Sequence, residues 1–148
     1  MSSEGVIRHA GLLARFEAGD WRGVLIEGPS GSGKSDLALR ALDAGWSLVS
    51  DDRTLLWVCK DRLYGRAPDT LAGLIEARGV GVLPQAGRAY ARIHMIARCV
   101  DAEAVDRLPN EETLSLLGVS LPLVRLAALE ASAPAKLSRA LTRLGVRR

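Results

Sequence analysis

Cysteine and aromatic residues are scarce in this sequence of 148 residues, and long apolar runs are absent from it. The two cysteines, Cys59 and Cys99, are isolated within apolar runs, which indicates buried free thiols rather than a disulfide or a metal pair. Aromatic residues make up 4%, and no basic cluster with interleaved aromatics is present, which argues against nucleic-acid binding. No apolar run approaches a membrane span and the start lacks a signal-peptide pattern, so the sequence predicts a cytoplasmic location.

The bulk composition is that of an ordinary globular protein. Apolar residues make up 48% of the chain and charged residues 25%. The length is sufficient to bury a core without disulfides or a structural metal, so we expect residues 1–148 to form one domain. The net charge of +3 suits phosphate ligands or an acidic partner surface.

One stretch satisfies the phosphate-loop pattern G-x-x-x-x-G-K-[ST] at every specified position, namely Gly28-Pro-Ser-Gly-Ser-Gly-Lys34-Ser35. In such a loop, glycines let backbone N–H groups turn toward a polyphosphate, the lysine reaches the β- and γ-phosphates, and the hydroxyl ligates Mg²⁺. The apolar run Val24-Leu25-Ile26 predicts a buried strand upstream, and residues 36–44 predict a helix downstream. The stretch therefore predicts a nucleoside triphosphate site.

A strand predicted over residues 46–49 ends at the acidic pair Asp51-Asp52. Because neighbouring strands bring their carboxyl ends to one edge of a sheet, we expect these carboxylates near the phosphate loop. Consecutive side chains at an extended strand end point to opposite sides. One aspartate could therefore hold a metal ion while the other meets an acceptor hydroxyl.

The rest of the chain departs from a purely alternating β-α order. Residues 54–59 and 63–66 flank Lys60-Asp61-Arg62, which predicts a β-hairpin. Further strands are predicted over 6–16, 21–26, 91–100 and 114–119. We also expect a turn over 17–20, a short helix over 70–74 capped by Asp69, an exposed loop over 101–112, helical spacing from Leu123 and a C-terminal helix over 135–144.

Four other side chains could carry chemistry. A lone histidine is more often structural than functional, which applies to His9 near the start and to His94 in the strand 91–100. Glu76 and Arg78 lie on the same side of an extended segment, so a carboxylate and a guanidinium could serve one anionic site. A surface charge pair is the alternative interpretation of these two residues.

Four segments together resemble the catalytic domain of bacterial HPr kinase/phosphorylase. They are His9-Ala10, the block 23–39 around the phosphate loop, the segment 45–53 with its acidic pair, and Ile75-Glu-Ala-Arg-Gly-Val-Gly81. Their order and spacing agree with the family from about residue 6 to about residue 84. The last segment is the most discriminating of the four, because phosphate loops are common and the Glu-x-Arg-Gly-x-Gly pattern is not.

The resemblance implies an ATP- and Mg²⁺-dependent kinase that phosphorylates a serine of HPr, a small phosphocarrier of phosphotransferase systems. Family members also remove that phosphate with inorganic phosphate. The implied fold is α/β, a P-loop-containing mixed β-sheet resembling the phosphoenolpyruvate carboxykinase-like fold with flanking helices, and the implied assembly is a hexamer.

The resemblance also assigns roles to positions of this sequence, with Asp51 as the base toward the acceptor serine. The implied catalytic residues are Asp51, His9, Lys34 and Arg78. The implied metal ligands are Ser35, Asp52 and Glu76. The implied nucleotide-binding residues are Gly28, Ser30, Gly31, Ser32, Gly33, Lys34 and Ser35.

Two features depart from the family pattern. The sequence begins almost directly at the catalytic domain, so it looks like a short form without the N-terminal domain. The family usually has a Pro-x-x-Pro-Gly-Arg-Asn-like loop near its C-terminus, and the corresponding Leu121-Pro-Leu-Val-Arg125-Leu-Ala-Ala128 offers only Arg125 for that arginine. This difference puts the dephosphorylating activity in question. A small-molecule or nucleotide kinase and a non-catalytic ATP-binding regulatory module are the alternative functions.

Overall fold

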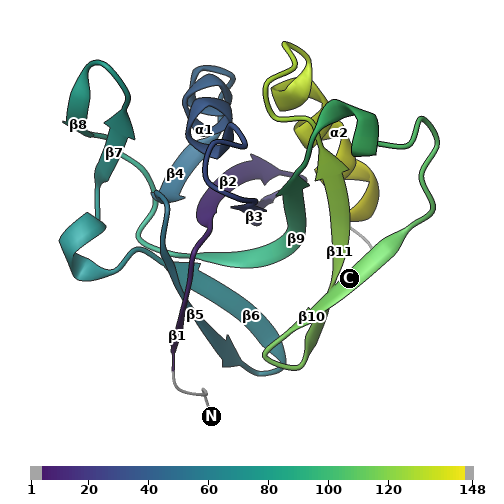
Figure 1. The fold of residues 1–148 in the computed structure, drawn as a ribbon. Helices are drawn as coiled ribbons and strands as arrows, with labels where there is room; N and C mark the ends of the chain where they lie inside the picture. Colours follow the sequence, from purple (N-terminus) through teal and green to yellow (C-terminus); the bar gives the residue numbers. More distant parts are fainter. Residues whose placement is uncertain (1–4, 146–148) are drawn as a thin grey trace.

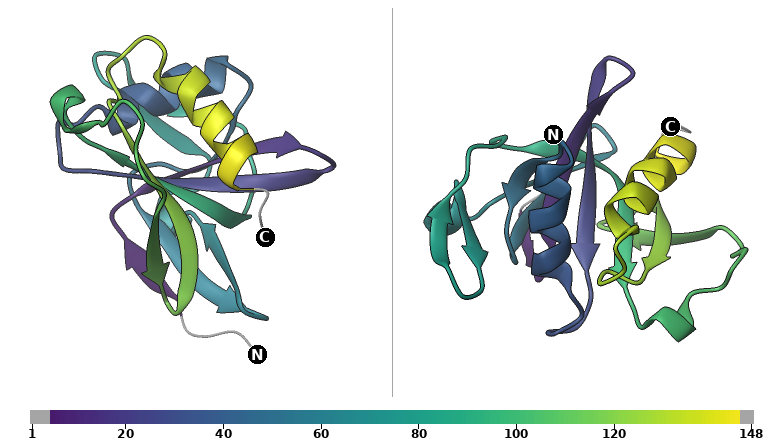
Figure 2. Two further views of the ribbon diagram at one scale, coloured as in Figure 1. Left: turned by 90° about the vertical axis from the view of Figure 1, so that its right-hand side faces the viewer. Right: turned by 90° about the horizontal axis from the view of Figure 1, so that it is seen from above.

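One large curled sheet carries both helices on the same face (Figures 1 and 2). The structure is a computed structural model that describes residues 5–145. The helices are α1 (Lys34–Asp43) and α2 (Ala133–Leu144). The strands are β1 (Val6–Arg8), β2 (Gly11–Glu17), β3 (Asp20–Glu27), β4 (Ser47–Ser50), β5 (Thr54–Cys59), β6 (Arg62–Arg66), β7 (Leu74–Ala77), β8 (Gly81–Pro84), β9 (Ala91–Cys99), β10 (Glu112–Leu116) and β11 (Val119–Leu126). Short 3-10 helices span Asp69–Leu71 and Ala102–Ala104.

The large sheet is mixed, as the resemblance to the HPr kinase family implied. Its nine described strands follow the order β1-β5-β6-β9-β3-β2-β4, and β10 joins through β11, which pairs with β9. The pairs β3–β9 and β9–β11 are parallel and the remaining pairs of this sheet are antiparallel. Strands β7 and β8 form a separate antiparallel hairpin beside the helix α1 (Figure 1).

Two hydrophobic clusters cover the two faces of the sheet. In β2 and β3, consecutive residues alternate between them, since Leu13 and Ile26 belong to the helix-side cluster whereas Leu12 and Leu25 belong to the opposite one. Helices α1 and α2 complete the helix-side cluster with Leu37, Leu137 and Leu141. Burial on both faces explains why these strands read as continuous apolar runs in the sequence.

Most predicted elements before residue 100 are present. The predicted hairpin is β5–β6, and its turn residues Lys60 and Asp61 have positive φ angles of 52° and 63°, which suits the twist of the two strands. The helix α1 ends before Gly45, whose φ of 99° is the left-handed conformation common after a helix. In the described part of the chain, no helix is long and apolar enough to cross a membrane.

The N-terminal strand prediction was partly wrong. The predicted strand over 6–16 is divided into β1 and β2, which pair with different neighbours, and His9 lies at the break. Asp69 does not cap a helix over 70–74, because its carboxylate pairs with Arg66 and the short 3-10 helix begins at Asp69 itself.

The prediction for the region after residue 112 was wrong in two places. The single strand expected over 114–119 is a hairpin, in which Leu117 and Gly118 form the turn between β10 and β11. The apolar spacing from Leu123 that suggested a helix belongs to β11, which continues to Leu126. Pro134 lies in the first turn of α2, where its missing N–H costs no helical hydrogen bond.

Candidate active site

The phosphate loop connects β3 to α1, at the edge of the sheet where β3 ends. Gly28 and Gly33 have φ angles of 149° and 94°, and a Cβ at either position would lie 2.8 Å from a neighbouring side-chain atom, on Ser32 and Leu129 respectively. Both positions therefore require glycine. Lys34 Nζ donates a hydrogen bond to the Gly28 carbonyl at 2.5 Å, so the lysine at the end of the loop is bonded to the residue that begins it.

The acidic pair reaches the same edge by a different route from the one predicted. Strand β4 is not a neighbour of β3, because β2 lies between them. Since β2 runs antiparallel to both strands, β3 and β4 are parallel to each other and end at the same edge. Asp51 and Asp52 follow β4 and therefore lie near the phosphate loop, as expected.

Asp52 faces the solvent side of this edge and pairs with His9. Its φ of 66° is in the left-handed region, which turns the chain sharply after Asp51. The His9 Nε2 and Asp52 Oδ1 atoms lie 2.7 Å apart, and both side chains are about half exposed. The break between β1 and β2 is what brings His9 to this position.

The side chain of Asp51 is less exposed than that of Asp52 and is hydrogen-bonded to the backbone of β7. Its Oδ2 atom accepts a hydrogen bond from the backbone N–H of Glu76 at 2.9 Å. Burial raises the pKa of Asp51 above its usual value, and the nearby charges of Asp52 and Glu76 act in the same direction, while the Glu76 hydrogen bond opposes them. The two adjacent carboxylates therefore have different partners and different surroundings.

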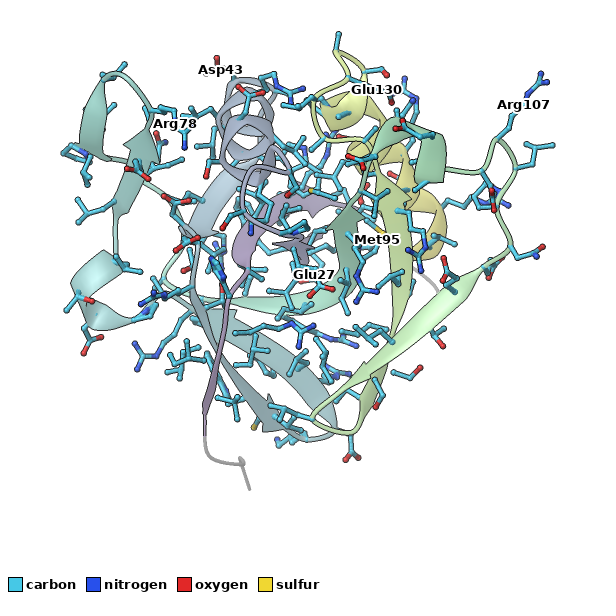
Figure 3. All side chains as sticks on the ribbon, viewed as in Figure 1. Glu27, Asp43, Arg78, Met95, Arg107 and Glu130 are labelled. Atoms are coloured by element: carbon cyan, nitrogen blue, oxygen red, sulfur yellow. The ribbon has the colours of Figure 1, made fainter. Side chains whose placement is uncertain are left out.

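One cavity of about 510 Å³ collects most of the predicted site residues. The strand β7 and the turn after it contribute Glu76 and Arg78, and Figure 3 shows Arg78 at the hairpin beside α1. The predicted residues that line the cavity are His9, Ser30, Gly31, Gly33, Lys34, Ser35, Asp52, Glu76 and Arg78. Asp51 is not among them and lines a smaller adjoining cavity together with Lys34, Ser35 and Asp52.

The donor set fits Mg²⁺ when it is shared with a polyphosphate. Within residues 5–145, no group of three or more histidine, cysteine, aspartate or glutamate side chains could hold a metal ion by itself. Mg²⁺ usually takes only one or two carboxylates from a protein and completes its shell with phosphate oxygens and water. Ser35, Asp52 and Glu76, the ligands that the resemblance implies, line the same cavity and offer such oxygens, and Asp51 offers a further carboxylate beside Ser35 in the adjoining cavity.

Other candidate residues lie elsewhere. Arg125 does not reach the cavity, because it is on β11 and forms a two-point ion pair with Glu112. His94 is buried, as its structural interpretation required, and burial lowers its pKa to about 4. Cys59 and Cys99 are free thiols, of which Cys99 is buried and Cys59 partly so.

Two features beside the phosphate loop were not predicted. Glu27, the last residue of β3, accepts two hydrogen bonds from Arg8 on one oxygen and two from Arg98 on the other, at 2.6–3.0 Å. Figure 3 shows Glu27 near the middle of the molecule. Leu129 packs against Gly33 and lines the cavity. The position of Glu27, a charged residue at the end of an apolar strand, was a feature of the sequence that could have drawn attention to it. No feature of the sequence pointed to Leu129.

Comparison with known proteins identifies the family of the chain. A family model described as HPr Serine kinase C-terminal domain matches residues 6–141. The chain is 38% identical to an HPr kinase/phosphorylase of Polaromonas naphthalenivorans over 110 residues, covering 66% of this chain and 35% of that protein. It is 34% identical to an HPr kinase/phosphorylase of Stenotrophomonas maltophilia over 141 residues, covering 85% of this chain and 45% of that protein.

A solved structure supports the fold as well. The structure of the HPr(Ser) kinase/phosphatase from Coxiella burnetii superposes with a TM-score of 0.77 at 24% identity, covering 93% of this chain and 95% of that chain. The chain spans less than half the length of the two curated relatives above. With the phosphate loop, the acidic edge and the Glu-x-Arg segment in one cavity, and with the family model matching residues 6–141, the chain belongs to the family of HPr serine kinase C-terminal domains.

Proposed function

We propose that this chain is an ATP- and Mg²⁺-dependent kinase that phosphorylates a serine of an HPr-type phosphocarrier protein. The observation that carries the proposal is the His9–Asp52 pair, with 2.7 Å between Nε2 and Oδ1, in the same cavity as Lys34 and Ser35. A phosphate loop binds the donor, and a carboxylate oriented by a histidine can receive a hydroxyl proton from the acceptor. The relatives named HPr kinase/phosphorylase support the choice of acceptor.

In the proposed mechanism Asp52 is the base, and His9 orients it. This reverses the split implied by the resemblance, in which Asp51 was the base and Asp52 a metal ligand. Asp52 is favoured because it lines the large cavity, where an acceptor can enter, whereas Asp51 lies in the smaller cavity with one oxygen bonded to Glu76. As the γ-phosphoryl group moves to the serine oxygen, Asp52 takes the serine proton.

Lys34 and Arg78 are the proposed cationic partners of the transferring phosphoryl group. Both line the cavity, and Arg78 is carried there by the turn after β7. Ser35, Asp51 and Glu76 are the proposed holders of Mg²⁺, which when bound neutralises charge on the β- and γ-phosphate oxygens. Positioning and charge neutralisation supply most of the catalysis of phosphoryl transfer.

We also propose, in a weaker form, dephosphorylation with inorganic phosphate, in which the phosphoryl group passes from the serine oxygen to the entering phosphate and forms pyrophosphate. It needs Asp52 in its protonated state to return a proton to the serine oxygen, which the same geometry allows. It also needs cations around the entering phosphate, and Arg125 does not supply one because it is engaged with Glu112 outside the cavity.

We further propose that residues 1–148 form a single catalytic domain and that the protein assembles as a hexamer. We also propose that the sheet is of the phosphoenolpyruvate carboxykinase-like type, which the mixed sheet around the phosphate loop supports. Light scattering of the purified protein measures the assembly directly, and a monomer would contradict the hexamer.

The test is to incubate the protein with ATP, Mg²⁺ and the HPr proteins of its own organism and to look for phosphoserine by mass spectrometry. Asp52→Asn should slow transfer by about 10²–10⁴-fold while nucleotide affinity changes little, since a general base is removed and the loop is kept. Absence of transfer by the wild-type protein would refute the kinase. Transfer to small acceptors alone would favour a small-molecule kinase, and a stable HPr complex with unchanged ATP would favour a regulatory module.

A further inference from the structure

A second cavity, of about 700 Å³, lies on the other side of the phosphate loop from the acidic pair. Its walls are the segment from Cys99 to Ala104 after β9, the turn 127–130 between β11 and α2, and the loop residues 29–32. In the sheet, β9 lies on one side of β3, whereas β2 and β4 lie on the other. Figure 3 accordingly shows Arg78 and Glu130 on opposite sides of α1.

The two cavities meet at the phosphate loop. Ser30, Gly31 and Leu129 line both of them. The first cavity contains Asp52, which the proposed mechanism places at the γ-phosphoryl group. A nucleotide whose γ-phosphate lies there extends along the loop away from Asp52, so its other end lies toward the second cavity.

The two cavities differ in charge, as the two parts of a nucleotide do. The cations Lys34 and Arg78 line the first cavity. Among the described residues that line the second cavity, none is a lysine or an arginine, and two are the carboxylates Asp101 and Glu130. Like charges repel, so these carboxylates disfavour phosphate groups when no cation lies between them. The second cavity therefore suits the uncharged part of a nucleotide.

Small apolar side chains leave room in the second cavity. Ala102, Ala104, Ala127 and Ala128 line it, and Leu129 lies beside them and is 69% exposed. Apolar walls with a few polar groups are typical of sites for small molecules. A flat base that packed against Leu129 would remove this apolar surface from water, which is favourable.

We propose that the second cavity holds the base and ribose of the donor nucleotide, with Leu129 against the base and Asp101 accepting hydrogen bonds from the ribose hydroxyls. The inference rests on the proposed function, which places the γ-phosphate at Asp52. No hydrogen bond or ion pair within residues 5–145 engages the Asp101 carboxylate, whereas Glu130 is paired with Lys136 at 2.9 Å. A carboxylate that accepts a hydrogen bond from a ribose hydroxyl is a recurrent feature of nucleotide sites.

The first test is Ala104→Trp, which fills the cavity from an exposed position outside the core. Isothermal titration calorimetry with Mg²⁺ and without HPr measures the binding of ATP and of inorganic tripolyphosphate, which has the three phosphates but no nucleoside. We expect the affinity for ATP to fall at least about tenfold, whereas the affinity for tripolyphosphate stays at the wild-type value. Glu103→Trp is the matched control, because Glu103 is exposed on the same 3-10 helix and does not line the cavity. It should leave both affinities unchanged.

The second test concerns the ribose contact of Asp101. The wild-type protein should bind ATP at least about tenfold more tightly than 2′,3′-dideoxy-ATP, since a hydrogen bond to a charged group is lost with the hydroxyls. Asp101→Ala should bind the two nucleotides equally, and its affinity for tripolyphosphate should not fall. Equal binding of the two nucleotides by the wild type would overturn the role of Asp101.

The outcomes for Ala104→Trp separate the inference from its alternatives. Equal losses of affinity for ATP and for tripolyphosphate would overturn it, because the phosphate loop itself would then be altered. An unchanged affinity for ATP would also overturn it, and a raised KM for HPr in that case would assign the cavity to the acceptor protein. Because the binding measurements omit HPr, a wild type that binds ATP as expected but phosphorylates no HPr would refute the proposed kinase and still support this nucleoside site.

Discussion

At the scale of single residues, the backbone turns sharply at Asp52, and two adjacent carboxylates end in different surroundings. Asp52 meets His9 in the open cavity, whereas Asp51 is partly buried against the backbone of Glu76. Burial disfavours the charged form of a carboxyl group, so Asp51 is ionised at a cost to the stability of the fold. A residue that is kept charged at such a cost is a candidate for holding a cation.

Asp51→Asn should raise the melting temperature at pH 7 and lower the rate of phosphoryl transfer by about 10–100-fold. The sign follows from the raised pKa of Asp51: the folded state binds the proton more tightly than the unfolded state, so stability falls as pH rises through this range. The gain in melting temperature should therefore disappear below pH 3.8, the ordinary pKa of the group. Thermal unfolding from pH 3 to pH 8 measures it, and a lower melting temperature at pH 7 would contradict the account.

At the scale of elements, the turn between β11 and α2 is attached to helix α1 by one side chain. Arg40 donates to the backbone carbonyls of Ala128 and Glu130 and to the carboxylate of Asp36. This attachment holds Leu129, which lies between those two carbonyls, against Gly33 of the phosphate loop. Through Leu129, the segment after β11 thereby contributes an apolar side chain to the cavity beside the phosphate loop.

Arg40→Ala should destabilise the protein by about 1–3 kcal/mol, because two carbonyls lose a charged donor. Hydrogen exchange should become faster at residues 127–130 and in the phosphate loop, and the affinity for ATP should fall. Arg40→Lys keeps the charge but not the planar fork, so it should restore only part of the protection. Unchanged exchange at residues 127–130 in Arg40→Ala would show that the turn is held by other contacts.

The elements around the phosphate loop could be predicted from sequence because their signals are local. The apolar run of β3, the glycines of the loop and Gly45 after α1 each act within a few residues. The β10–β11 hairpin could not be predicted in this way. Its turn places Leu117 at a φ of 49°, which leucine rarely adopts, and the apolar residues of β11 at helical spacing are set by pairing with β9.

In the site, too, some features follow from nearby residues in the sequence, whereas others depend on contacts between distant residues. The resemblance to the HPr kinase family, and not the residues alone, implied that His9, the acidic pair and Glu76 belong to one site, but it did not imply that Asp52 rather than Asp51 pairs with His9. That choice depends on the left-handed backbone at Asp52 and on the Glu76 amide, which lies 25 residues farther along the chain. No local pattern contains this information.

At the scale of the whole molecule, Glu27 connects three strands at the base of the phosphate loop. It lies on β3, and its arginine partners lie on β1 and β9. Burial alone would raise the pKa of Glu27, but Arg8 and Arg98 outweigh it and hold that pKa below its usual value. Arg8 directly precedes His9, so the same carboxylate connects the start of the phosphate loop with the histidine of the site.

Glu27→Gln should destabilise the fold by about 2–4 kcal/mol, because it leaves two arginines without their shared carboxylate. The lowered pKa of Glu27 means that its stabilisation is present above pH 4.5 and is lost as pH falls through the folded-state pKa, so the difference should shrink in acid. Urea unfolding at pH 7 and pH 3 measures it. Glu130→Gln, which affects an exposed pair with Lys136, is the control and should stay within about 0.5 kcal/mol; equal losses in the two variants would contradict this role of Glu27.

The long strand β9 has a consequence for the order in which the protein assembles. It is bonded to β6, β3 and β11, and so joins the two ends of the large sheet. Every residue placed in the proposed phosphoryl-transfer chemistry precedes Ala91, where β9 begins. As the chain leaves the ribosome, the complete set of reacting groups therefore exists before the strand that holds β3 in place. A nascent chain stalled before residue 91 would carry all of the chemistry and none of the folded site.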